Sequence, residues 1–237
     1  MRKVLLVLVI LLAGGLVAAD RIGVRYAQDE IARQVAAQYD LPRRPDVTIH
    51  GVPFLTQAVG GEYDRIEVVI GDWSQAGVAV RDVRVEMRGV GAPPADVAAG
   101  NATNVTVRTA TASAVVPYEV LRRRAPKEIS RIGPKGDDLE VEMTGSVLGF
   151  RLSGTAVLSV KATRGGITIS PVSVGADSAQ IPLPLVRDRL TWTVPVTNLP
   201  VGSRISRIQP TPEGLRVSAT ADDLQLNNLR GVARTGS

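Results

Sequence analysis

Few side chains in this sequence are of the types that carry out catalysis. The chain of 237 residues has no cysteine and one histidine, His50, which excludes a thiolate nucleophile, a disulfide scaffold and the usual multi-histidine metal centres. No serine lies in a G-x-S-x-G pentapeptide, the usual setting of a hydrolase nucleophile. The carboxylate pairs Asp137-Asp138 and Asp222-Asp223 lie in turn-like contexts, typical of loop or capping residues. We therefore expect no enzymatic activity, no cofactor and no bound metal.

Positive charge is concentrated in one short segment. Between Val116 and Lys135, six basic and two acidic side chains give a net charge of +4, against +5 for the whole chain. Each basic residue near an anionic lipid surface contributes roughly 1 kcal/mol, so contact with head groups is the functional interpretation. A solvated helical face is the ordinary alternative, and nucleic acid is a poor one because no aromatic platform accompanies the arginines. The residues expected to contact a membrane are Arg122, Arg123, Arg124, Lys127 and Arg131.

Several large apolar side chains, most of them outside the regular strand pattern, could line an acyl-chain cavity or its mouth. Each buried methylene of a fatty tail contributes about 0.8 kcal/mol, so an aliphatic slot would hold such a tail. Packing in an ordinary core is the alternative for each residue. The candidate lipid-binding residues are Phe54, Leu55, Trp73, Phe150, Leu183, Leu185, Trp192 and Leu199.

The N-terminal residues predict an export signal. Arg2-Lys3 precede sixteen uncharged residues, Val4–Ala19, whose small C-terminal residues resemble a cleavage site. As a helix this run reaches only ~24 Å, short of the ~30 Å hydrocarbon core of a bilayer. Residues 1–19 are therefore interpreted as a cleaved signal peptide or a short membrane anchor. Either one predicts an extracytoplasmic protein, secreted or attached to the outer face of the cytoplasmic membrane.

From Asp20 onward the pattern is that of an amphipathic helix. Asp20 is a suitable N-terminal cap, and the helix is expected to end before Leu41-Pro42, because proline disfavours helical geometry in the residue before it. Its narrow stripe of mostly small apolar side chains suits close packing against a curved sheet. The stripe consists of Val24, Ala27, Ile31, Val35 and Tyr39.

Most of the remaining chain alternates apolar and polar residues with the period of a β-strand. The clearest run is Phe150–Lys161, whose twelve residues would span ~40 Å, about twice the common strand length. Strands of this length must twist and coil, and Gly154 would allow a bend. Such strands predict an antiparallel sheet with one wet and one dry face. Other residues expected on the dry face are Ile66, Val68, Ile70, Val83, Val85, Met87, Val105, Val107, Leu139, Val141 and Met143.

Two segments depart from the strand pattern. Val116–Gly133 is expected to form one or two short helices that begin near Pro117. Ile181–Leu185 has prolines at every second position, so an edge strand or a connector is expected there. Residues 231–237 are expected to be disordered. No low-complexity linker interrupts the sequence, which favours a single domain over residues 20–230.

One block of sequence resembles a known family. Residues 47–66 follow the pattern V-x-I-x-G-x-PFLTQ-x(3)-G-x-Y-x-R-I, which is similar to the LmeA family of actinobacterial phospholipid-binding envelope proteins. Residues 198–202 and 213–217 also resemble that family. The resemblance implies phospholipid binding outside the cytoplasmic membrane and a fold related to tubular lipid-binding proteins. The predicted fold is α+β, with one long N-terminal helix wrapped by a strongly curved antiparallel β-sheet of long strands, and short accessory helices.

These features favour an extracytoplasmic phospholipid-binding protein with a role in cell-envelope lipid or glycolipid metabolism. Its expected partners are a phospholipid, anionic in charge, and the membrane surface, with the acyl chain in a slot between helix and sheet. The alternative is a structural module that binds another envelope protein or a polysaccharide. A weaker alternative is a hydrolase of envelope lipids, which would need a carboxylate or His50 at the same slot. The lipid interpretation requires unfilled space beside Asp20–Tyr39.

Overall fold

The protein is described by a computed structural model covering residues 2–75, 78–98, 104–147, 150–163, 166–176, 179–180, 182–196 and 202–225. The chain forms two compact units. Unit 1 comprises Met1–Gly71, Arg84–Thr111 and Ala221–Ser237, and unit 2 comprises Asp72–Val83 and Ala112–Thr220. The expectation of one domain over residues 20–230 stays a prediction, and residues 231–237 lie outside the described residues.

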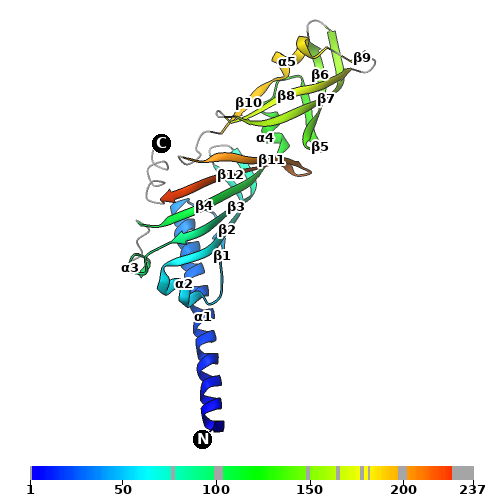
Figure 1. The fold of residues 1–237 in the computed structure, drawn as a ribbon. Coiled ribbons are helices and arrows are strands. Elements are labelled where there is room, and N and C mark those ends of the chain that lie inside the picture. The colour runs from blue at the N-terminus through cyan, green and yellow to red at the C-terminus, as the bar shows by residue number, and fades with distance from the viewer. Residues whose placement is uncertain are drawn as a thin grey trace. The chain divides into compact units, whose positions relative to one another are not determined.

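Figure 1 shows the elements of the chain in sequence order. The helices are α1 (Arg2–Gln38), α2 (Phe54–Gly60), α3 (Pro94–Ala98), α4 (Tyr118–Arg122) and α5 (Leu183–Leu190). The strands are β1 (Asp46–His50), β2 (Glu62–Gln75), β3 (Val78–Gly91), β4 (Thr106–Val116), β5 (Ile129–Lys135), β6 (Asp138–Val147), β7 (Phe150–Thr163), β8 (Gly166–Ala176), β9 (Ala179–Gln180), β10 (Trp192–Pro195), β11 (Arg204–Thr211) and β12 (Gly214–Gln225).

The strands form a sheet with the order β1-β2-β3-β4-β12-β11 and a second with the order β10-β8-β7-β6-β5, in which β9 also pairs with β8. The hairpins pair antiparallel, as in β6–β7 and β7–β8. Together with α1 and the short helices, this curled antiparallel architecture confirms the predicted fold class. Four strands, β2, β3, β4 and β12, contribute residues to both units.

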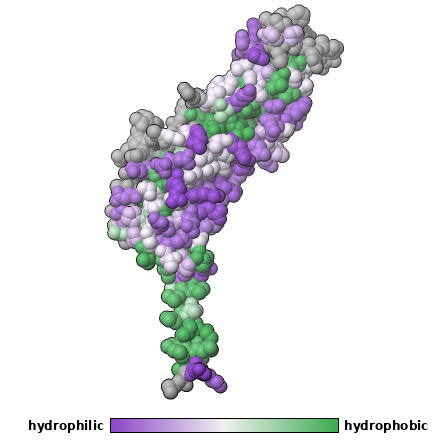
Figure 2. Space-filling view, in the orientation of Figure 1, coloured by the Kyte–Doolittle hydropathy of each residue, from purple (hydrophilic) through white to green (hydrophobic). Residues whose placement is uncertain are grey.

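Helix α1 is a single continuous helix through the predicted leader and the predicted amphipathic segment. The expectation that Asp20 begins a helix is therefore wrong, because Asp20 lies in the helix interior. The helix ends at Gln38, before Leu41-Pro42 as expected. By length and composition α1 could cross a membrane. Figure 2 shows the apolar surface of its N-terminal half, which protrudes from unit 1.

The C-terminal half of α1 packs into the core of unit 1. Val24 is buried there, and Ala27, Ile31 and Val35 pack against the same core, as the stripe predicts. Tyr39 departs from this prediction: it lies beyond the last helical residue and is exposed. The helix faces the buried side of the sheet, whose core residues include Ile49, Ile66, Val68, Val90 and Val107.

Unit 2 has its own core, built mainly from β5 to β8. The alternation predicted for β6 and β7 is confirmed, because Leu139, Val141 and Leu158 are fully buried. β7 is fourteen residues long, in line with the expected long strand. Its pairing with β8 shifts register at Val157, the one residue of this strand that departs from the alternation.

Two local expectations need correction. In residues 116–133 the expected short helix near Pro117 is present as α4, but the segment continues from Ile129 as strand β5. The reason is that Ile129 and Ile132 are buried in the core of unit 2 and pair with β6. Leu183 begins helix α5 where an edge strand or connector was expected. Proline is tolerated in the first helical turn because its missing N–H has no partner there, and Pro184 occupies such a position.

Candidate functional site

Helix α2 contains the PFLTQ block and lies against α1. The Phe54 ring is buried, with its centroid 6.2 Å from that of Tyr63. The ring lies close to Gly23 of α1, where an added Cβ would be in van der Waals contact with it at 3.4 Å. Phe54 is therefore a core residue at the junction of α1, α2 and β2.

Asp20 fixes the N-terminus of α2 from 35 residues away. Its side chain is 6% exposed, and its carboxylate accepts a hydrogen bond of 2.8 Å from the Leu55 N–H. Arg21 pairs with the other carboxylate oxygen at 3.0 Å. Pro53 occupies the N-cap position of α2 and makes no side-chain cap. The Leu55 N–H, which has no partner within α2 because it lies in the first helical turn, is thus satisfied by a residue in the middle of α1.

Gln57 joins α2 to the strands on either side of it. Its amide nitrogen donates to the His50 carbonyl at 3.3 Å, and its amide oxygen accepts from the Asp64 N–H at 3.0 Å. The Gln57 side chain lies over Gly51, where an added Cβ would lie 2.4 Å from it. The PFLTQ block therefore acts in the structure as a clamp that holds α1, β1 and β2 together.

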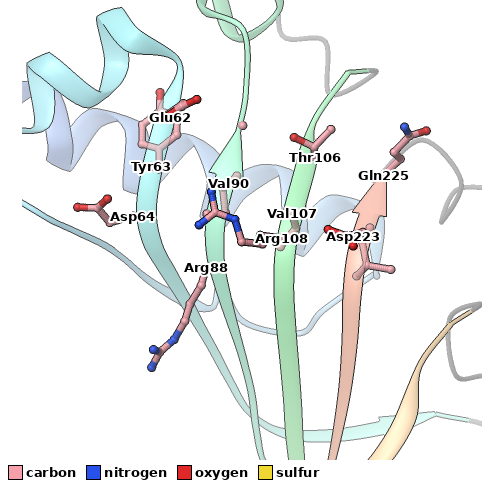
Figure 3. Close-up of a pocket in the computed structure, with 13 residues that line it drawn as sticks. Glu62, Tyr63, Asp64, Arg88, Val90, Thr106, Val107, Arg108, Asp223 and Gln225 are labelled. Atoms are coloured by element: carbon pink, nitrogen blue, oxygen red, sulfur yellow. The ribbon is translucent and has the colours of Figure 1, made fainter.

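A cavity of about 500 Å³ opens on unit 1 across β2, β3, β4 and β12. It is lined by consecutive residues of these strands, so the backbone forms its floor. Tyr63, Val90 and Val107 are buried beneath the floor, whereas the charged walls are exposed. The cavity therefore lies on the sheet face opposite to α1, which passes behind the strands in Figure 3. We call it the groove; its exposed side chains are Glu62, Asp64, Arg88, Thr106, Arg108, Asp223 and Gln225.

Two glycines keep the floor of the groove open. The Arg108 side chain lies over Gly89, where an added Cβ would approach the Arg108 Cβ to 3.0 Å. Gly89 also has a positive φ of 59°, which favours glycine. A Cβ at Gly91 would lie 2.6 Å from the Thr106 hydroxyl. A side chain at either position would displace the polar groups that form the walls.

The groove combines cationic, anionic and neutral polar groups. Arg88 donates to Glu86 at 2.5 Å, whereas Arg108 has no ion pair among the residues that the structure describes. A guanidinium binds a phosphate or carboxylate through paired N–H groups, and carboxylate and amide groups bind hydroxyls. The described residues contain no cluster of three potential metal ligands. The arrangement suits a polar ligand that carries both an anionic group and hydroxyl or ammonium donors.

His50 takes part in surface contacts on β1 and β2. Arg65 donates to its Nδ1 at 3.0 Å, and its Nε2 lies 3.6 Å from a carboxylate oxygen of Glu67. Glu67 also pairs with Arg84 at 3.4 Å. Because a donating guanidinium makes Nδ1 the acceptor, Nε2 carries the proton that faces Glu67. This network orients side chains along the strands.

The apolar candidates for lipid binding belong to both units. Phe54 is core, and Leu55 beside it is partly exposed. Trp73 is half-buried in β2, and Trp192 packs against the core of unit 2. Phe150, Leu183 and Leu185 lie in β7 and α5 with side chains outside the description, and Leu199 lies outside the described residues. Their role as a lipid lining stays a prediction. Beside Val24–Val35, the described side chains form a packed core.

The basic segment is a charged surface of unit 2. Arg122, Arg123, Arg124 and Lys127 are exposed and have no ion pair within the part of the chain that is described. Arg131 is also exposed and lies 3.5 Å from Glu142. A surface whose cations lack acidic partners keeps its charge available to an anionic ligand.

The groove residues were not among those predicted from the sequence. Arg88 and Arg108 looked like ordinary outward-facing positions of alternating strands. Gly89 and Gly91 are the signal that could have pointed to them, because a glycine in a strand often marks a bulge or a close approach. The groove itself depends on the register of strands more than 100 residues apart, which no local pattern specifies.

Comparison with known proteins gives one family. A family model described as LmeA-like phospholipid-binding matches residues 18–220. The match begins beside Asp20 and includes the clamp, most of the groove and the basic segment. No curated protein and no solved structure matches the chain significantly.

Proposed function

Because the chain belongs to the LmeA-like phospholipid-binding family, we propose that it is a non-enzymatic protein that binds phospholipid outside the cytoplasm, in the handling of envelope lipids or glycolipids. The family match over residues 18–220 is the observation that carries this proposal. The extracytoplasmic location is supported by Arg2-Lys3 followed by the uncharged run Val4–Ala19.

In this proposal the groove receives the polar head group. Arg108, which has no acidic partner among the described residues, offers its guanidinium to a phosphate, and Asp64 and Asp223 accept from hydroxyl or ammonium groups of the same ligand. The mixture of charges favours a head group that carries both a phosphate and hydrogen-bond donors, such as hydroxyl or ammonium groups, over a simple anion.

The basic segment supports attraction to an anionic membrane. Arg122, Arg123, Arg124 and Lys127 are exposed, and each would contribute roughly 1 kcal/mol near an anionic surface. A lipid whose head group lies in the groove cannot also place its acyl chains between α1 and the sheet, because the sheet separates the two sites. The space between α1 and the sheet is a packed core and would have to open to hold the acyl chains of a lipid bound there instead.

Native mass spectrometry after gentle purification tests the proposal directly. We expect co-purified phospholipid. We also expect Arg108→Glu to reduce the lipid-bound fraction several-fold, because the guanidinium is replaced by a carboxylate that repels the phosphate. Arg207→Glu, at an exposed position in β11, is the matched control and should leave that fraction unchanged. Absence of any retained phospholipid in the parent protein would refute the function. Equal binding by both variants would refute the role of the groove.

One observation favours a second candidate, a structural module that binds an envelope polysaccharide or protein. Phe54 is packed as a core residue, as that alternative predicts. A polysaccharide would place its hydroxyls against the same carboxylates in the groove. Binding of envelope glycan together with no retained lipid would identify this second function.

A further inference from the structure

An apolar collar is formed by α1 and the adjoining α2 segment where α1 leaves the core of unit 1, and we propose that this collar sits at the surface of a lipid bilayer that α1 spans as a retained anchor. The collar consists of Ile22, Tyr26, Val52, Leu55 and Val59. This attachment is separate from cargo binding and from the basic segment. It does not depend on whether a phospholipid occupies the groove.

The collar side chains are exposed, so no described part of the protein covers them. Val52 and Val59 are 75% and 81% exposed, and Ile22 and Tyr26 are 68% and 69% exposed. Val52 lies just before α2, and the other four residues belong to α1 and α2. These two helices touch, because a Cβ at Gly23 would lie 3.6 Å from the Leu55 side chain. In Figure 1, α2 lies beside α1 where that helix emerges from the sheet. Figure 2 shows apolar surface both on the protruding helix and at the adjoining end of unit 1.

The occupant of this surface follows from its continuity with α1. The helix presents exposed apolar side chains from Val4 to Val17, and it is long and apolar enough to cross a membrane. The run Val4–Ala19 reaches only ~24 Å, but residues 4–26 of the same helix reach ~34 Å, enough for a hydrocarbon core of ~30 Å. Tyr26 then lies at the depth where amphipathic aromatic side chains gather at the membrane interface.

The charges within this stretch are arranged compatibly with a bilayer. Asp20 is hidden from the surroundings, because α2 covers it and the Leu55 N–H and Arg21 satisfy its carboxylate. Arg21 is neutralised by its ion pair with Asp20, and Arg25 is exposed and long enough to extend its guanidinium group to the lipid head groups. The buried carboxylate thus removes the one acidic charge that would face the acyl chains.

The same contact argues for retention of residues 1–19. Asp20 directly follows the residues that resemble a cleavage site, and in the folded protein it is both helical and buried. A peptidase needs this segment extended and accessible, so docking of α2 would protect it in any chain that folds before cleavage.

Site-directed spin labelling tests the proposal, since the chain has no cysteine of its own. The full-length protein is reconstituted in vesicles of phosphatidylcholine and phosphatidylglycerol with one label, at Leu6→Cys, Val59→Cys or Gln38→Cys. Gln38 lies on α1 ~18 Å beyond Tyr26 and is exposed. Relaxation by oxygen, which concentrates in lipid, is compared with relaxation by a water-soluble nickel chelate.

We expect relaxation by oxygen to dominate at Leu6 and relaxation by nickel to dominate at Gln38. At Val59 both reagents should act, and the ratio of oxygen relaxation to nickel relaxation should be several-fold higher than at Gln38. A Val59 label as accessible to nickel as the Gln38 label would overturn the collar. So would a Val59 label shielded from both reagents, which would indicate a protein partner or a second copy. An intact mass that lacks residues 1–19 in protein isolated from membranes, or an aqueous Leu6 label, would overturn the anchor. Absence of bound phospholipid in native mass spectrometry leaves all of these results unaffected.

Discussion

The carboxylate of Asp20 is the acceptor on which the position of α2 depends. It is buried in unit 1, receives the Leu55 N–H at 2.8 Å and pairs with Arg21. No side chain of α2 itself caps that helix. A single substitution at Asp20 should therefore loosen the contact between α1 and α2.

We expect Asp20→Ala to lower the free energy of unfolding by about 1–3 kcal/mol, because the Leu55 N–H loses its partner in a buried setting. Asp20→Asn keeps an acceptor oxygen and should cost less. Asp29→Ala, at an exposed position of the same helix, is the control and should change stability by less than about 0.5 kcal/mol. Urea denaturation in detergent measures all three. Equal stability of the Asp20→Ala and Asp29→Ala proteins would contradict the capping role.

Two tyrosines make stability depend on alkaline pH. Burial raises the pKa of the Tyr63 hydroxyl, and burial also raises that of Tyr118, whose hydroxyl donates to the Thr211 carbonyl at 2.7 Å. A pKa raised by folding means that the folded state favours the neutral phenol. The stabilisation is fully present below the unfolded pKa of about 10 and is lost as the pH rises through the higher folded pKa.

Stability should accordingly fall above about pH 10, and Tyr63→Phe should reduce the slope of that fall because it removes one titrating group. Tyr63 is the cleaner test, since Tyr118→Phe also removes a hydrogen bond. Urea midpoints measured between neutral and alkaline pH give the slopes. A Tyr63→Phe slope equal to that of the parent protein would show that Tyr63 does not contribute.

At the scale of elements, α4 and the residues after it present the basic segment. Leu121 is the residue of α4 that is buried in the core, whereas the arginines of the segment are exposed and do not contribute to core packing. Charge and stability can therefore be changed separately there.

Replacing Arg122, Arg123 and Arg124 with Glu should strongly weaken binding to anionic vesicles, because three favourable charges become repulsive. The melting temperature should change little, as the three side chains are exposed. Co-sedimentation with phosphatidylglycerol vesicles at low and high salt measures the effect, and Arg207→Glu controls for a general loss of positive charge. Unchanged vesicle binding would mean that the basic segment is only a solvated surface.

The long strands and the C-terminal half of α1 could be predicted because periodicity over many residues is a strong signal. Leu139, Val141 and Leu158 were placed on the buried face by alternation alone, and all three are buried. Helix α2 has seven residues, too few for a helical period to show between Pro53 and Gly61. The continuity of α1 through Ala19 was missed because the leader pattern and the amphipathic pattern follow different rules.

The candidate site was harder to predict than the fold. The partner of Asp20 lies 35 residues away, and the walls of the groove come from strands that are distant in sequence. The PFLTQ block was identified as distinctive, but its residues were assigned to a pocket mouth. In the structure Phe54 and Gln57 clamp secondary-structure elements together. The sequence motif shows that the residues of this block are distinctive, but their structural role depends on tertiary contacts that the motif does not specify.

At the scale of the whole molecule, the two cores are linked by shared strands. β2, β3, β4 and β12 each contribute residues to both units. If one unit unfolded alone, each shared strand would lose its hydrogen bonds to neighbouring strands over part of its length. This continuity predicts cooperative unfolding of the two units.

Calorimetry of the full chain in detergent should show one transition whose calorimetric and van't Hoff enthalpies agree. Val107→Ala in the core of unit 1 and Leu215→Ala in the core of unit 2 should both lower the same transition. The expected losses are roughly 1–3 kcal/mol and about 2–5 kcal/mol, respectively, from the cavities created. Two resolved transitions, each sensitive to only one variant, would show instead that the units unfold independently.

The unbroken course of α1 from Arg2 to Gln38 has a mechanical consequence. A flexible tether would let a folded body turn freely above a membrane. In the proposed membrane-bound state a stiff helix cannot, so residues 27–38 would take on whatever tilt the bilayer imposes on residues 4–26. The sheet packed against that helix would then keep a fixed inclination and a fixed height above the lipid.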